Sequence, residues 1–150
     1  DAHSTNIKSV KLLGDVKGKV AFLADDMLGT GGTLLKAMSF LKEQGATKVI
    51  CAISLPLFTG DAIKDFDEAY KKGLFYRIIG TNAVYHENLL SREWFINTDV
   101  SGLFANVITR THYNQSLSEL LDNRNIIEKV VKQNSNPVSC EEKKEDSKKE

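Results

Sequence analysis

The sequence predicts a three-layer α/β fold, in which a mainly parallel sheet lies between layers of helices. Two observations lead to this expectation. Short apolar runs alternate with segments of helical periodicity, and a glycine ends each of the first two helical segments. Alternating strands and helices are typical of parallel sheets with crossover helices. The 150 residues, of which 41% are hydrophobic, suffice for one compact domain.

The first strand and the first helix are expected between residues 20 and 45. The run VAFLADD (20–26) is apolar until two carboxylates end it, which is the pattern of a buried parallel strand. The segment TLLKAMSFLKEQG (33–45) repeats apolar residues at helical spacing. Its last residue, Gly45, stands where a helix C-terminal cap is expected.

Further elements follow in the same order. The expected strands are 48–55, 75–81 and 93–99, and the expected helices are 59–73, 101–111, 117–121 and 126–131. The connection 81–92 has no clear pattern. Residues 1–131 are predicted to form one domain, and residues 132–150 a disordered charged tail with little to bury. Because the sequence opens with Asp1, we expect a chain cut from a longer one, although processing or the choice of expressed region gives the same start.

Composition narrows the classes of partner and location. Twenty Lys and Arg balance twenty Asp and Glu, so no nucleic-acid or membrane partner is expected. No signal peptide is seen, and no run approaches the roughly 20 apolar residues of a membrane span. Cys51 lies in an apolar run and Cys140 in the polar tail, so we expect no disulfide and a reducing, cytoplasmic location.

The segment DDMLGTGGT (25–33) carries the chemistry. Asp25 and Asp26 end a strand, and a Gly-rich turn then leads into a helix. Ligands of open parallel sheets bind at this end of the strands, and N–H groups at a helix start bind phosphate. Thr30 and Thr33 add hydroxyl donors, while the carboxylates can accept sugar hydroxyls or hold a hydrated divalent cation. A turn that only permits tight packing is the alternative, but adjacent acids at a buried strand end favour a ligand site.

Two common phosphate motifs are excluded, because neither GxxxxGK[ST] nor GxGxxG is present at this turn. DDMLGTGGT resembles the phosphoribosyl-diphosphate loop of type I phosphoribosyltransferases. The flanks GDVKGK (14–19) and EQGATKV (43–49) resemble ribose-phosphate pyrophosphokinases, and NLLSREWFINTDVSGLFANVITRTHYNQSLSELL (88–121) resembles their longer bacterial form. The resemblance covers most of residues 12–131 and implies the C-terminal half of such an enzyme, with a fold of the type I phosphoribosyltransferase kind.

The resemblance also implies an activity and a ligand. Such enzymes transfer the β,γ-diphosphoryl group of ATP to the anomeric hydroxyl of ribose 5-phosphate, with Mg2+. The acid that binds the ribose corresponds to Asp25, and Asp26 is given a supporting role. The loop that binds the 5-phosphate corresponds to Gly29, Thr30, Gly31, Gly32 and Thr33. Gly29 departs from the family, which more often has Asp there.

The family's ATP site, magnesium-binding His and catalytic Lys and Arg precede the region that this chain matches. We therefore assign no catalytic residue and no metal ligand, and expect the chain to be inactive alone. ATP would bind through the missing N-terminal half, and the resemblance implies a homo-oligomer. Two alternatives stay open: a complete small phosphoribosyltransferase, and a non-catalytic phosphoribosyl-binding module.

The remaining residues of interest are read as structural. The three histidines, His3, His86 and His112, show none of the spacings of a metal site. Trp94 and Phe95 are expected in the core or an interface, as aromatic residues of strands usually are. Residues 54–60 follow the second strand and are expected at the same sheet edge as the Gly-rich turn.

Overall fold

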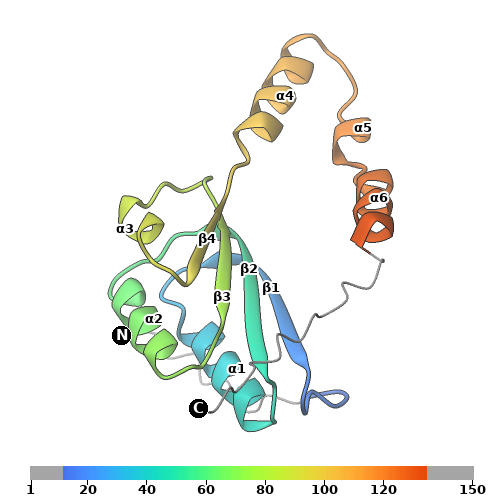
Figure 1. Cartoon of the computed structure of the whole chain (residues 1–150). Helices are drawn as coiled ribbons and strands as arrows, with labels where there is room; N and C mark the ends of the chain where they lie inside the picture. Colours follow the sequence, from blue (N-terminus) through green and yellow to red (C-terminus); the bar gives the residue numbers. More distant parts are fainter. Residues whose placement is uncertain (1–11, 135–150) are drawn as a thin grey trace, which may run out of the picture. The chain divides into compact units, whose positions relative to one another are not determined.

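The computed structural model describes residues 12–134. The chain divides into two units, Asp1–Gly102 and Leu103–Glu150. Figure 1 shows the helices and strands of both units. Within residues 12–134, no helix combines the length and the apolar character that a membrane span requires.

The first unit contains a four-stranded parallel sheet with strand order β1-β2-β3-β4 (Figure 1). The strands are β1 (Val20–Leu28), β2 (Lys48–Pro56), β3 (Arg77–Thr81) and β4 (Phe95–Thr98). The helices between them are α1 (Gly32–Glu43), α2 (Ala62–Lys71) and α3 (Glu87–Leu90). The predicted α/β class with a parallel sheet is confirmed.

The second unit is helical. Its helices are α4 (Ser101–His112), which begins at the border of the first unit, α5 (Ser118–Leu121) and α6 (Arg124–Asn134). All three were predicted. Helix α6 continues to Asn134, beyond the predicted start of the tail, and residues 135–150 lie outside the described residues. The single domain 1–131 stays a prediction.

The hydrophobic core lies on one face of the sheet. Every second residue of β2 points to this face, and Val49, Cys51 and Ile53 are at most 2% exposed. The helices facing them bury Leu34, Met38 and Leu41 of α1 and Ala62, Phe66 and Ala69 of α2. Each large apolar side chain buried in this way stabilises the fold by about 1.5–3 kcal/mol. Helices α1 and α2 therefore form one helical layer, and a second layer on the opposite face stays a prediction.

Glycines end both long helices of this unit, as the sequence predicts. Gly45 follows α1 with φ of 89°, and Gly73 follows α2 with φ of 71°. The Gly45 N–H donates to the Lys42 carbonyl and the Ala46 N–H to the Leu41 carbonyl, each at 3.0 Å. These bonds satisfy carbonyls that the end of a helix leaves without intrahelical partners.

The predicted burial of β1 is wrong. Within residues 12–134, β1 pairs only with β2, and Leu28 alone of its nine residues is buried. Asp25 and Asp26 are both exposed, so the argument that acids at a buried strand end demand a ligand does not hold. An apolar run has the same appearance in an edge strand as in a central one, because periodicity does not report neighbours in the sheet.

Trp94, just before β4, and Phe95, the first residue of β4, lie in the core, as predicted. Trp94 is 2% exposed and Phe95 is half-buried against the same core. Strand β4 is shorter than predicted, since Trp94 precedes it and Asp99 follows it. Helix α3 lies in the connection 81–92, which the sequence left undefined.

Candidate phosphate-binding site

A short loop at the carboxyl end of β1 leads into α1. Its residue Gly31 is the N-terminal cap of α1 and has a left-handed backbone, with φ of 76°. A Cβ atom at Gly31 would lie 2.3 Å from Cε2 of Phe66 on α2. Backbone conformation and packing both require glycine here, so α2 lies directly behind the loop.

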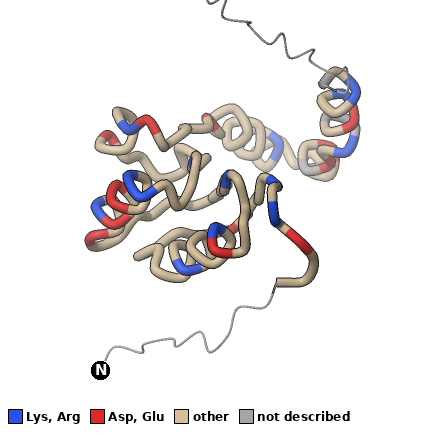
Figure 2. The backbone as a smooth tube through the Cα atoms, turned by 60° about the horizontal axis from the view of Figure 1, so that its bottom comes forward, with Lys and Arg blue, Asp and Glu red and all other residues tan. Residues whose placement is uncertain are grey.

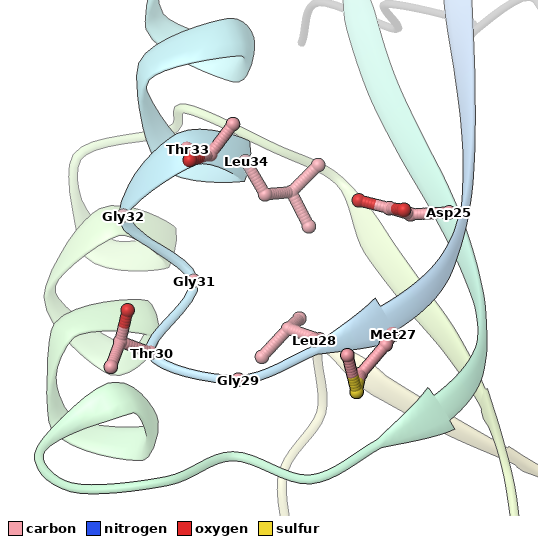
Figure 3. A pocket seen from close by; sticks show the side chains of 9 residues that line it. All are labelled: Asp25, Met27, Leu28, Gly29, Thr30, Gly31, Gly32, Thr33 and Leu34. Atoms are coloured by element: carbon pink, nitrogen blue, oxygen red, sulfur yellow. The ribbon is translucent and has the colours of Figure 1, made fainter. Parts of the chain in front are cut away.

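The loop and β1 enclose a pocket of about 350 Å3 (Figure 3). Its lining consists of Asp25, Met27, Leu28, Gly29, Thr30, Gly31, Gly32, Thr33 and Leu34. Figure 3 shows the Asp25 side chain pointing from β1 toward the start of α1, where Thr33 and Leu34 lie. The structure thus brings together all the predicted site residues except Asp26.

The start of α1 supplies hydrogen-bond donors to this pocket. The first intrahelical bond runs from the Leu35 N–H to the Gly31 carbonyl, at 2.9 Å. The N–H groups of Gly32, Thr33 and Leu34 have no intrahelical acceptor, as at any helix N-terminus. Gly31 provides no side-chain cap, and the first turn contains no acidic residue. These donors and the positive end of the helix dipole favour an anion in the pocket.

Asp25 and Asp26 have different surroundings. Asp25 is paired in register with the buried Ile53, so its side chain lies on the core side of the sheet, and Asp26 follows on the other side. The Asp26 N–H donates to Oδ1 of Asp25 at 2.9 Å. Asp26 therefore contacts the Asp25 carboxylate through its backbone, whereas its own side chain is outside the pocket lining.

Cys51 lies on β2 beside this site but is not a reactive group. Burial, together with the negative charge of Asp25, raises the pKa of its thiol to about 12. The thiol is therefore neutral at physiological pH and cannot act as a nucleophile. Cys51 is free, and Cys140 lies outside the described residues.

The segment after β2 donates backbone hydrogen bonds to the start of the loop. The N–H groups of Leu57 and Phe58 donate to the Leu28 carbonyl at 2.9 and 3.0 Å, and the Thr59 N–H donates to the Gly29 carbonyl at 3.1 Å. The sequence predicts that this segment lies at the same sheet edge. It does not predict these bonds, because no local pattern marks a contact between residues about thirty positions apart.

Metal-binding side chains do not gather in the described part of the chain. Residues 12–134 contain no group of three or more His, Cys, Asp or Glu side chains arranged to hold an ion. His86 instead lies with Nε2 2.9 Å from the Pro56 carbonyl oxygen, a hydrogen bond in which the ring donates, and its ring meets Phe58 edge-on.

Several known proteins are similar to this chain. Ribose-phosphate pyrophosphokinase of Chlorobaculum tepidum is 33% identical over 81% of this chain and 36% of its own length. The enzyme of the same name from Wolinella succinogenes is 36% identical, over 79% of this chain and 37% of its own. A crystal structure of phosphoribosylpyrophosphate synthetase from Mycobacterium smegmatis has a TM-score of 0.59 and 31% identity, covering 68% of this chain and 33% of that one.

The chain thus spans about a third of the length of the curated relatives that it matches. Residues 2–122 match the family model described as the phosphoribosyl synthetase-associated domain. This match includes the whole sheet of the first unit and every residue that lines the pocket, and it agrees with the family that the sequence resembles. The chain belongs to the phosphoribosyl synthetase-associated domain family.

Proposed function

We propose that this chain forms the ribose 5-phosphate-binding part of a ribose-phosphate diphosphokinase. That enzyme transfers the β,γ-diphosphoryl group of ATP to the anomeric hydroxyl of ribose 5-phosphate and releases AMP. One observation carries the proposal: a single pocket has helix-start N–H donors at one end and the Asp25 carboxylate at the other. A sugar phosphate needs donors for its phosphate and an acceptor for its hydroxyls, and the pocket offers both.

The 5-phosphate would accept hydrogen bonds from the N–H groups of Gly32, Thr33 and Leu34 and from the hydroxyls of Thr30 and Thr33. Hydrogen bonds to a charged group contribute about 1.5–3 kcal/mol each, and the helix dipole adds about 0.3–1 kcal/mol. Gly29 and Gly31 let the backbone approach the ligand closely. The ribose hydroxyls would donate to Asp25, whose carboxylate the Asp26 N–H holds.

Transfer of a diphosphoryl group depends mainly on positioning and on neutralising charge. In phosphate enzymes one or two carboxylates commonly hold Mg2+ together with phosphate oxygens and water, and the described residues that line this pocket include one carboxylate, Asp25. Asp25 is the pocket carboxylate that could hold it, and Mg2+ when bound would supply positive charge against the ligand's phosphates. The proposal places ATP and the groups that act on it in the remainder of a longer, cytoplasmic, homo-oligomeric protein, and the chain alone is expected to be inactive.

One observation favours a second candidate, a phosphoribosyl-binding module without catalysis. No Lys, Arg or His is among the described residues that line the pocket. Neutralising the charge of a transferring diphosphoryl group generally requires such cations. The pocket by itself is therefore equipped for binding. Diphosphoryl transfer by the complete protein, measured as AMP released from ATP and ribose 5-phosphate, separates the two candidates.

Calorimetric titration of the chain with ribose 5-phosphate and Mg2+ tests the binding role. The parent is expected to bind, and Asp25→Asn to weaken binding by tenfold or more, because it removes a charged acceptor worth about 1.5–3 kcal/mol. Binding of inorganic phosphate should change little in the same variant, since phosphate contacts the helix start. Asp61→Asn is the matched control, as Asp61 is an exposed carboxylate outside the pocket lining.

The proposal is contradicted if folded parent protein binds inorganic phosphate but shows no preference for ribose 5-phosphate. It is also contradicted if Asp25→Asn binds ribose 5-phosphate as tightly as the parent. Loss of binding in Asp61→Asn would point to a general charge effect rather than to this pocket.

A further inference from the structure

Residues 57–59, called the clip here, hold the start of the phosphate-binding loop through backbone hydrogen bonds. Three consecutive N–H groups of the clip donate to two consecutive carbonyls, those of Leu28 and Gly29, at 2.9 to 3.1 Å. Leu28 and Gly29 begin the loop that leads, through Thr30 and Gly31, to the helix-start N–H groups at the pocket. The path of the loop between β1 and α1 is therefore fixed by a segment far away in the sequence.

The clip has its shape because Phe58 adopts a left-handed backbone, with φ of 45°. Such a backbone in a bulky residue costs about 1–3 kcal/mol and persists only where its surroundings impose it. The Phe58 ring supplies that constraint, since it is 5% exposed and packs edge-on against Phe66 with centroids 5.4 Å apart. Further contacts come from the rings of His86 and Trp94, each at 6.0 Å.

The rings of Phe58 and Phe66 together support both ends of the loop. Phe58 acts at Leu28 and Gly29 through the clip, and Phe66 lies against Gly31, where Cε2 would be 2.3 Å from an added Cβ. The loop thus lies on an aromatic pair contributed by the clip and by α2. Donors held in place before a ligand arrives lose less entropy on binding than donors that must be ordered.

We propose that the clip is a positioning element of the phosphate-binding loop, which holds the Leu28 and Gly29 carbonyls so that the N–H groups at the start of α1 face Asp25. Its effect on ligand affinity rests on the proposed function, whereas its effect on the motion of the loop does not. The two parts are therefore tested separately.

Amide hydrogen exchange in the parent chain tests the bonds themselves. The Phe58 and Thr59 amides should exchange as slowly as those of the β1–β2 ladder, although they follow the end of β2. Exchange at the rate of an open loop means that the clip is not formed, and the proposal then fails whatever the variants show.

Thr59→Pro tests the consequence for the loop. Proline has no N–H to donate to Gly29, and it disfavours the left-handed backbone of the preceding Phe58. Thr59 is exposed, so little packing is lost. Asp61→Pro is the matched control in the same connection, because its φ of −87° is near that of proline and no described bond depends on its N–H. The preceding residue, Gly60, also has a left-handed backbone, but glycine has no Cβ for the proline ring to meet.

Without ligand, Thr59→Pro should lower the 15N order parameters of residues 29–32 from rigid values of about 0.85 toward those of a mobile loop, below about 0.6. Ribose 5-phosphate affinity should fall about tenfold. Asp61→Pro should change neither. Fluorescence of Trp94, the one tryptophan of the sequence, reports whether the aromatic pair stays packed.

If Thr59→Pro folds and the order parameters of residues 29–32 are unchanged, the clip does not position the loop, even where the parent binds ribose 5-phosphate. Higher loop mobility in Thr59→Pro, together with no binding by the parent, supports the clip and contradicts the proposed function of this chain. If Thr59→Pro does not fold, hydrogen exchange of the Phe58 and Thr59 amides in the parent tests the clip: slow exchange supports it, and exchange at the rate of an open loop contradicts it.

Discussion

The three glycines of the proposed phosphate-binding loop, Gly29, Gly31 and Gly32, differ in what the structure demands of them. Gly31 has a positive φ and touches Phe66, so no other residue fits without strain. A Cβ at Gly32 would meet nothing within 4 Å, and one at Gly29 would meet only the Thr59 hydroxyl, at 3.7 Å. The Asp that the family more often has would therefore fit at Gly29. With glycine at this position, Asp25 is the one carboxylate among the described residues that line the pocket.

This difference predicts opposite effects of two alanine substitutions. Gly31→Ala should lower the free energy of unfolding by about 2–4 kcal/mol, the sum of a strained φ and an overpacked contact with Phe66. Gly32→Ala should raise it by about 0.5–1 kcal/mol, since alanine favours the helix start over glycine. Urea unfolding followed by Trp94 fluorescence measures both. A Gly31→Ala variant as stable as Gly32→Ala would contradict the packing of Phe66 behind the loop.

The raised pKa of the buried Cys51 thiol should make the free energy of unfolding fall at alkaline pH. Its folded-state pKa is raised from 9.0 to about 12, so the thiol stays neutral in the fold but ionises in the unfolded chain above pH 9. Its contribution is therefore complete below pH 9 and is lost as the pH rises toward 12. The free energy of unfolding should fall by up to about 1.4 kcal/mol per pH unit across this range.

Urea titrations of the parent and of Cys51→Ala at pH 8, 9 and 10 isolate this effect, because other groups titrate alike in both proteins. The parent should lose more stability than the variant between pH 9 and 10. Equal losses would mean that the thiol is open to solvent in the folded protein.

At the scale of elements, one charged contact joins α2 to the segment between α3 and β4. The Asp67 carboxylate accepts hydrogen bonds from Nε and Nη2 of Arg92, both at 2.9 Å, and from Nε1 of Trp94 at 2.7 Å. Burial opposes ionisation of Asp67, but the hydrogen bonds and charge of Arg92 and the bond from Trp94 outweigh it, and the pKa of Asp67 is lowered. The contact holds Trp94, whose ring centroid lies 6.0 Å from those of both Phe58 and Phe66, the aromatic pair behind the loop.

Asp67→Asn should lower the free energy of unfolding at pH 7 by about 1.5–3 kcal/mol, because charged hydrogen bonds are lost. A lowered pKa means that Asp67 stabilises the fold above its ordinary pKa of 3.8 and that this stabilisation is lost as the pH falls through the folded-state value. The variant should therefore lose less stability than the parent on acidification. Glu68→Gln, a neighbour on α2, is the control, and an equal effect of both substitutions would contradict this role.

The sequence predicted the elements well where local chemistry decides them. Gly45 and Gly73 end their helices as expected, and the apolar spacing identified the buried face of α1. The burial of β1 was wrong because strand order is set by pairing between distant segments. Helix α3 was not predicted, since four residues give too short a pattern for periodicity to show.

The site shows the same limit. Asp25 and the loop residues line one pocket because they are close in sequence and the strand-turn-helix pattern places them together. Asp26 has the same residue type as Asp25 but lies on the other side of β1, where the period of two in a strand puts it. The bonds from the clip and the contact of Phe66 with Gly31 depend on tertiary packing, which no local motif records.

At the scale of the whole molecule, Lys and Arg do not gather in one stretch of the described residues 12–134. Figure 2 shows Lys and Arg interspersed with Asp and Glu along both units. This distribution agrees with the equal numbers of basic and acidic residues in the sequence. Anion binding therefore depends on local donors such as those at the start of α1, and the absence of a nucleic-acid partner stays a prediction.

Large apolar side chains are also exposed in both units. In the first unit they include Val20 and Phe22 of β1 and Ile96 of β4, which are 44 to 63% exposed. Exposed apolar patches commonly mark contacts with other chains or domains. They agree with the proposal that this chain acts within a longer, oligomeric protein.

The central claim, that the pocket beside Asp25 binds ribose 5-phosphate, is tested most directly by amide NMR of the chain titrated with this ligand and Mg2+. The account predicts saturable shifts at residues 29–34 and at Asp25 and Asp26, which Asp25→Asn weakens and Asp61→Asn leaves unchanged. Saturable shifts confined to another part of the molecule, or a folded chain whose loop amides do not respond at millimolar ligand concentrations, would contradict it.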